Sequence, residues 1–129
     1  MPSPEIEEFA RILIQQVRDT AIRSNDCVLR PDVRHAIAER WRKAASSGGL
    51  EPIAKVLIPD VVDDTLFYLF RAIDEGFLKI SYTASNGQTV NLNSAGGGEL
   101  SGWIANRGAW IAQYSKERFV DNCAGLELE

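Results

Sequence analysis

The N-terminal part of the chain carries apolar residues at helical spacing. At about 100° per residue, one face collects Ile6, Phe9, Ala10, Leu13, Val17 and Ala21. Ser3 is placed to cap this helix, and Pro4 suits its first position. The turn-forming run Ser24-Asn25-Asp26 predicts where the helix ends.

A second helix is predicted from about Pro31 to Ala45. Its apolar stripe consists of Val33, Ile37, Trp41 and Ala44. The pair Gly48-Gly49 marks its end, since glycine favours the left-handed conformation that follows many helices. His35 projects away from the stripe, so we expect this histidine on the surface.

A third helical region begins near Glu51-Pro52. Pro59 is expected to break or kink it, because proline lacks the N–H and its ring clashes with the preceding turn. The main helix is then predicted from about Pro59 to Glu75, with Gly76 as its C-terminal glycine. Its apolar stripe consists of Val62, Leu66, Leu69, Phe70 and Ile73.

A β-hairpin follows at about residues 77–93, where Leu78, Ile80 and Tyr82 alternate with polar residues. A two-residue turn at Asn86-Gly87 would split the apolar residues between the two faces of the hairpin. A three-residue loop, Ser85-Asn86-Gly87, instead pairs Tyr82 with Val90 and Ile80 with Leu92, on one face. We therefore predict a type I turn with a G1 bulge and a left-handed Gly87.

After the hairpin, Ser94 to Gly98 is predicted as a glycine-rich loop. The segment from Glu99 to Val120 is predicted to be helical, with a break around Asn106-Arg107-Gly108. The fold class is therefore α+β and mainly α, with about four to five helices and one antiparallel β-hairpin. Residues 1–129 are expected to form one domain, since nothing inside them has the composition of a linker.

Charge narrows the range of partners. With 14 basic and 18 acidic residues, the net charge is −4, so the chain has no general attraction to phosphate backbones or anionic lipids. The predicted second helix is the only basic stretch, and its turn lacks a convincing DNA-binding motif. We expect neither a nucleic-acid partner nor a membrane partner, and we expect a cytoplasmic location, because no apolar run is long enough to span a bilayer and no signal-peptide pattern is present.

The sequence offers no strong catalytic, metal or cofactor signature. The run Gly96-Gly97-Gly98 lacks the lysine of a phosphate-binding loop. Cys27, His35 and Cys123 have no zinc-site spacing. The carboxylates of Asp60, Asp63 and Asp64 are what the first turns of a helix prefer electrostatically. We therefore expect no catalytic residue, no metal and no cofactor, and the leading hypothesis is a non-enzymatic protein-interaction module.

Aromatic residues define the alternative hypothesis. Trp103, Trp110 and Tyr114 would share one face of a continuous helix. Together with Tyr82 and the glycine-rich loop, they would line a pocket for a small ligand or an enzyme substrate. Aromatic residues at helical spacing also occur in hydrophobic cores, so the sequence leaves both interpretations open.

Phe67 and Tyr68 lie off the apolar stripe of the main helix, beside Asp64 and Arg71. A helix that is apolar on two sides is buried on two sides. Either this helix is central to the domain, or its second face meets another chain. The second reading predicts a homodimer with Phe67 and Tyr68 in the interface, and Asp64 and Arg71 paired across the axis or placed at the rim.

Light scattering tests the predicted homodimer. At micromolar concentration the wild-type chain should be a dimer, and the double substitution Phe67→Ser/Tyr68→Ser should shift it to monomer, because two exposed aromatics drive the association. A monomeric wild type would contradict the prediction. A variant that unfolds would show that both aromatics belong to the core.

Overall fold

The computed structural model describes residues 3–105 and 110–117. It is mainly helical with a two-stranded antiparallel sheet, which confirms the predicted α+β, mainly α class. In chain order the elements are α1 (Pro4–Ile12), the π-helical stretch η1 (Leu13–Arg18), α2 (Asp19–Val28), α3 (Ala36–Ser46), α4 (Leu50–Asp74), β1 (Ser81–Thr83), β2 (Thr89–Asn91), α5 (Leu92–Gly96), α6 (Leu100–Ala105) and α7 (Trp110–Tyr114).

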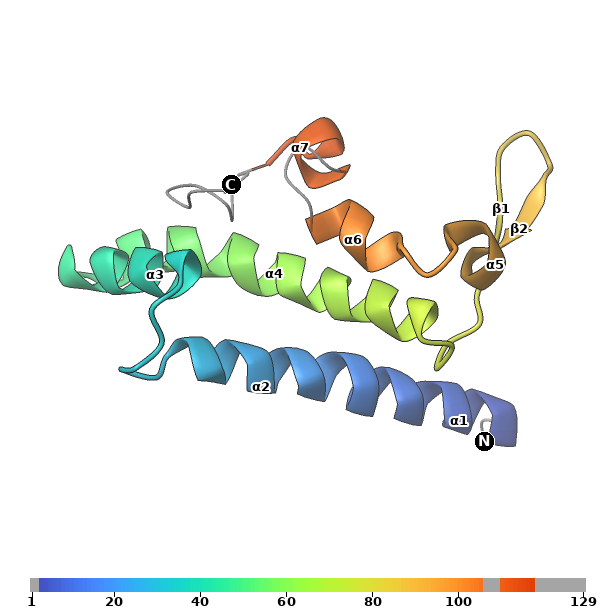
Figure 1. Ribbon diagram of the computed structural model, residues 1–129, viewed down its shortest axis with the longest axis horizontal. Coiled ribbons are helices and arrows are strands. Elements are labelled where there is room, and N and C mark those ends of the chain that lie inside the picture. The colour runs from blue at the N-terminus through green and yellow to red at the C-terminus, as the bar shows by residue number, and fades with distance from the viewer. Residues whose placement is uncertain (1–2, 106–109, 118–129) are drawn as a thin grey trace.

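The long helix α4 is the central element of this arrangement (Figure 1). It contacts α2, η1, α3, α5 and α6. Figure 1 shows α1, η1 and α2 as one rod along one side of α4, with α6 and α7 on the other side. The hairpin of β1 and β2 projects beyond the C-terminal end of α4.

The N-terminal rod begins as predicted but ends later. Ser3 caps α1, and its hydroxyl accepts a hydrogen bond from the Ile6 N–H at 3.3 Å. The predicted end at Ser24-Asn25-Asp26 is wrong, because α2 continues to Val28. The side chain of Asn25 donates to the Ala21 carbonyl at 2.7 Å and to Asp64 Oδ2 at 3.1 Å. These bonds satisfy within the helix a side chain that in isolation favours a turn.

The helix α3 begins at Ala36, five positions after the predicted start at Pro31. His35 caps it, with Nδ1 accepting from the Ala38 N–H at 3.2 Å, and its side chain lies on the surface as expected. The preceding turn is stabilised by Arg42, whose guanidinium donates to the carbonyl of Arg30 at 2.8 Å and also to that of Val33. A long-range contact of this kind has no local sequence signal.

The predicted break at Pro59 is wrong, because α4 runs through it without interruption. Proline removes one backbone hydrogen bond of the helix, and packing on several sides of α4 offsets this loss. Pro59 itself is buried. As a result Asp60, Asp63 and Asp64 lie in the middle of a helix and not in its first turn. The dipole at a helix start therefore does not explain these carboxylates.

The core gathers around the C-terminal half of α4. Its buried cluster consists of Val17, Ala72, Ile73, Leu78 and Leu100. Leu69 and Phe70 pack against the cluster, as the predicted stripe requires. The other two members of that stripe, Val62 and Leu66, are exposed. The prediction that they belong to the core is therefore wrong. The middle of α4 thus presents apolar side chains outside the core.

The hairpin has the predicted register, with Tyr82 opposite Val90. The Leu92 N–H donates to the Ile80 carbonyl at 2.8 Å, and Gly87 has the predicted left-handed conformation with φ of +87°. The alternating burial that the pattern indicates is present just before β1, where Leu78 is buried, Lys79 is exposed and Ile80 is half-buried. The strands β1 and β2 themselves are exposed.

The segment after the hairpin departs from the predicted loop and long helix. The predicted glycine-rich loop is partly helical, since α5 extends to Gly96. Residues 115–117 are not helical. The expected break at Asn106-Arg107-Gly108, and the helix beyond residue 117, lie outside the described residues.

Gly87→Ala should lower the free energy of unfolding by about 1 kcal/mol, because L-residues are strained at positive φ. A new Cβ would meet no atom within 4 Å, so the effect is conformational and not steric. Gly87→Asn is the matched control and should cost less, since asparagine tolerates this conformation. Equal denaturation midpoints for wild type and Gly87→Ala would contradict the assignment.

Candidate functional site

A buried carboxylate joins α3 to α4. Asp60 is 5% exposed. Both of its oxygens accept from Arg40 Nη2 at 2.8 Å, and Oδ2 also accepts from Trp41 Nε1 at 2.7 Å. A charge taken out of water is tolerated when it is paired and hydrogen-bonded. Asp60 therefore fixes α3 against α4, and two residues of the basic helix α3, Arg40 and Trp41, are engaged inside the chain.

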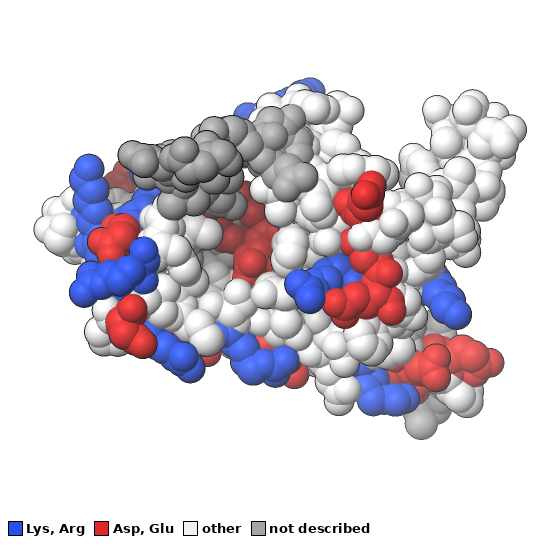
Figure 2. All heavy atoms as spheres, in the orientation of Figure 1, with Lys and Arg blue, Asp and Glu red and all other residues white. Residues whose placement is uncertain are grey.

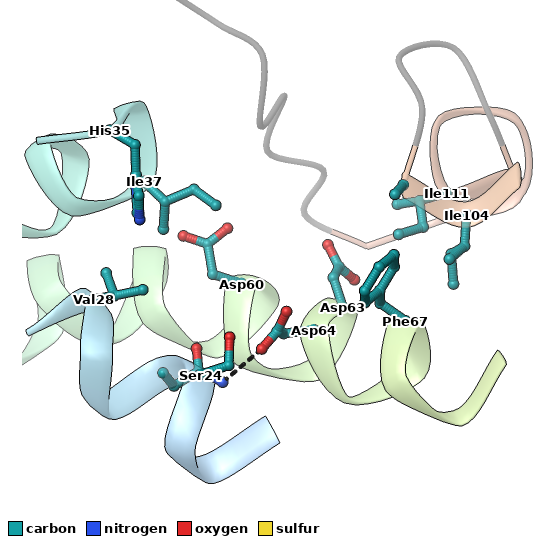
Figure 3. A pocket seen from close by; sticks show the side chains of 12 residues that line it. Ser24, Val28, His35, Ile37, Asp60, Asp63, Asp64, Phe67, Ile104 and Ile111 are labelled. Carbon is teal, nitrogen blue, oxygen red and sulfur yellow. Dashed lines mark hydrogen bonds between the residues drawn. The ribbon is translucent and has the colours of Figure 1, made fainter. Parts of the chain in front are cut away.

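A cavity of about 330 Å³ lies beside Asp60, between α2, α4 and α6. Figure 3 shows the carboxylates of Asp60, Asp63 and Asp64 directed into it from α4. The remaining lining residues are the polar Ser24, Asn25 and His35 and the apolar Val28, Ile37, Phe67, Ile104, Ala105 and Ile111. Figure 2 shows acidic side chains within a hollow on this face of the molecule, whereas Lys and Arg side chains gather at its α3 end.

Burial and mutual repulsion perturb two of the carboxylates. Burial raises the pKa of Asp63 above its ordinary value, and the charge of Asp60 raises it further. Burial also raises the pKa of Asp64; hydrogen bonds from Ser24 and Asn25 oppose this rise, and the charge of Asp60 adds to it. The cavity is thus an acidic environment in which the ionised carboxylates are imperfectly stabilised.

An apolar groove of about 580 Å³ continues from the cavity along α4. The two hollows share the lining residues Asp63, Ile104 and Ile111. The other residues that line the groove are Ile58, Pro59, Val62, Leu66, Phe70, Trp110, Tyr114, Ser115 and Glu117. The groove and the cavity therefore form one connected surface.

The helix α6 is held beside this surface by its own cap. Asp74, at the end of α4, accepts from the backbone N–H of Leu100 at 3.0 Å and of Ser101 at 2.9 Å. A carboxylate at a helix N-terminus satisfies N–H groups that have no partner within the helix. This cap positions Ile104, which lines both the groove and the cavity.

The aromatic residues of the predicted ligand pocket are brought together in part. Trp103 and Trp110 are in contact, with ring centroids 5.5 Å apart, and Trp110 also meets Phe70 at 5.8 Å. Trp110 and Tyr114 line the groove. Tyr82 lies on the hairpin. The hairpin is near one end of α6, whereas α7 is near the other end (Figure 1).

The predicted interface residues have contacts within the chain. Phe67 and Tyr68 meet edge to face, with ring centroids 5.1 Å apart. Tyr68 packs against the core cluster, and Phe67 lines the cavity. Asp64 accepts from Asn25, and Arg71 forms an ion pair with Glu75 at 2.8 Å.

The groove could not be predicted from the sequence, because the helical spacing of Val62 and Leu66 places them in the core stripe, whereas both are exposed. The sequence does show that this helix has more apolar residues than one buried face requires, but the helical projection assigns the additional exposed face to Phe67 and Tyr68. Among residues 3–105 and 110–117, no group of three or more His, Cys, Asp or Glu side chains is arranged to hold a metal ion. Within the same residues, no helix has the length and apolar character needed to cross a membrane.

Comparisons with protein-family models, with curated proteins and with solved structures found no significant match.

Asp60→Ala should lower the free energy of unfolding by about 3 kcal/mol, because it leaves the charge of Arg40 and the indole N–H of Trp41 without the buried carboxylate. The double substitution Arg40→Met/Asp60→Asn removes the charge and keeps an acceptor for Trp41, so it should cost less than Asp60→Ala. Chemical denaturation measures both. A midpoint unchanged by Asp60→Ala would show that the junction does not stabilise the fold.

Asp63→Asn should stabilise the protein at neutral pH. Because the folded-state pKa of Asp63 is raised, the native state binds the proton more tightly than the unfolded chain does. The resulting stabilisation is complete below the unfolded pKa and is lost as pH rises through the folded pKa. The advantage of Asp63→Asn in melting temperature should therefore grow from about pH 4 to about pH 7. A difference that does not change with pH would contradict this assignment.

Proposed function

We propose that this protein is a non-enzymatic protein-interaction module that binds an amphipathic helical segment of another protein in the groove along α4. One observation carries the proposal: Ile58, Val62 and Leu66 are 53%, 53% and 39% exposed on the central helix of the fold. Contiguous apolar surface of this kind is typical of interaction sites and binding grooves.

The spacing of these residues supports a helical occupant. Ile58, Val62 and Leu66 follow one another at intervals of four along α4, so they form a ridge on one face of the helix. Trp110 and Tyr114 also line the groove. Amphipathic helices bind such grooves through apolar anchors spaced by one and two turns. Aromatic walls are common at the centre of such interfaces.

Charge indicates the chemistry of the partner. The two charged residues that line the groove in the described part of the chain are both acidic, Asp63 and Glu117. A segment with basic residues beside its apolar stripe is complementary to this groove, and complementary charge favours both encounter and specificity. The occupant that fits is thus a basic amphipathic helix. We also propose a cytoplasmic location, supported by the small number of cysteines in the chain, which is two.

Self-association through Phe67 and Tyr68 stays a prediction. Both side chains are half-buried within the chain. The most exposed apolar residues of α4 are Ile58 and Val62 together with the terminal Leu50. A dimer that uses the groove would therefore place a different part of α4 in its interface.

Small-ligand binding is the second candidate function, and the aromatic contacts favour it. Trp103, Trp110 and Phe70 form a continuous cluster beside a hollow whose volume lies within the range of ligand pockets. A ligand enclosed there would change the fluorescence of the tryptophans without requiring the full length of the groove. Binding of a helix, in contrast, requires contacts with Ile58 and also with the aromatic residues Trp110 and Tyr114 of the groove.

A displayed library of amphipathic peptides about four turns long tests the proposed function. Selection should yield binders, and Val62→Gln/Leu66→Gln should weaken them about tenfold or more, because the substitutions remove two apolar anchors. Glutamine favours helix, so the helix should persist.

Ile14→Gln/Ile22→Gln is the matched control. These two residues are 46% and 43% exposed on the N-terminal rod, outside the groove. The control should bind the selected peptides as the wild type does. A library that yields no binder, or binders indifferent to the groove substitutions, would refute the proposed function.

A further inference from the structure

The cavity is a continuation of the groove, and its lining differs from the groove in chemistry. Asp63, Ile104 and Ile111 line both. A helix lying in the groove therefore passes the mouth of the cavity. One side chain of that helix, projecting at this point, can enter it.

The carboxylates in the cavity differ in how far the chain satisfies them. Asp60 is paired with Arg40 and Trp41. Asp64 accepts a hydrogen bond from Asn25 at 3.1 Å. The carboxylate of Asp63 makes no hydrogen bond or ion pair with any residue in 3–105 or 110–117. Of the three, Asp63 is the one left for an external donor, and it stands where groove and cavity meet.

We propose that the helical segment bound in the groove inserts one lysine or arginine side chain into the cavity, with its cationic head group against Asp63 and Asp64. This inference rests on the proposed function. The head group would donate to Asp63, which has no hydrogen-bond donor among the described residues, and charge-assisted hydrogen bonds are the stronger ones. Burial already disfavours the ionised state of both carboxylates, so a cation beside them would stabilise that state.

The walls of the cavity fit the remainder of such a side chain. Ile37, Phe67 and Ile111 supply apolar surface around the carboxylates (Figure 3). Lysine and arginine carry an apolar stem that packs on such surface while the head group reaches a polar partner. An ammonium or guanidinium on an aliphatic stem matches this combination of acidic floor and apolar wall.

The same chemistry argues against a second copy of this chain as the occupant. Among the described helices of at least eight residues, α1 is the one with no buried residue, so it is the helix that a second copy could offer. Its first turns carry Glu5, Glu7 and Glu8. These carboxylates would meet Asp63 and Glu117, and like charges at an interface are unfavourable. The complementary occupant is a basic helix from a different protein.

A matched pair of peptides tests this inference. One selected binder is synthesised with arginine at the position facing the cavity and again with glutamine there, and both dissociation constants are measured on the full chain. The arginine peptide should bind wild type about tenfold more tightly or better. On Asp63→Asn/Asp64→Asn this preference should disappear, while the glutamine peptide should bind both proteins equally. Asparagine at 64 still offers Asn25 an acceptor, which favours an intact fold.

Glu117→Gln is the control for a general effect of negative charge, since Glu117 lines the groove outside the cavity. It should leave most of the arginine preference in place. Equal binding of the two peptides to wild type would overturn the cavity inference and leave the proposed function standing. A preference that survives Asp63→Asn/Asp64→Asn would also overturn it. Failure of every peptide to bind would overturn both.

Discussion

The arrangement of the helices depends on the hydrogen-bonded contact between the buried carboxylate of Asp60 in α4 and the helix α3. This carboxylate accepts hydrogen bonds from two consecutive residues of α3, Arg40 and Trp41, and so fixes α3 against the middle of α4. Ionised groups are expensive to bury alone, and removing one member of a buried ion pair is strongly destabilising. The junction therefore specifies one relative position of the two helices. Pro59, the residue before this carboxylate, is buried within the same contact region, where packing supports the helix across the missing hydrogen bond.

Because α4 is continuous, its two halves serve different purposes. The C-terminal half contributes Ala72 and Ile73 to the buried cluster, and Leu69 and Phe70 pack against that cluster. The N-terminal half is held by α3 on one side and leaves Ile58 and Val62 exposed on another. Asp63 lines both the groove and the cavity, so a single helix carries apolar and acidic side chains in a fixed relation. Sites built on rigid elements hold their geometry more closely than sites on loops do.

Local sequence rules predicted the features that depend on local chemistry. The Ser3 cap and the left-handed Gly87 in its hairpin register follow from hydrogen bonding and side-chain alternation within a few residues. The continuity of α4 through Pro59 and of α2 through Asn25 could not be predicted, because tertiary partners supply what the local sequence lacks. The site was predicted least well. Three carboxylates near a proline are typical of a helix start, and only the structure shows that Asp60 meets Arg40 across two helices.

We propose that the exposed ridge of α4, formed by Ile58, Val62 and Leu66, and the adjoining cavity form one binding surface for a basic helix. Methyl chemical-shift mapping with a selected peptide tests it most directly, since isoleucine, leucine and valine methyl groups are distributed over the whole molecule. The resonances of Ile58, Val62 and Ile104 should shift on binding, whereas those of Ile14 and Ile22 on the N-terminal rod should not. Shifts confined to the N-terminal rod or the hairpin, with the ridge unchanged, would contradict it.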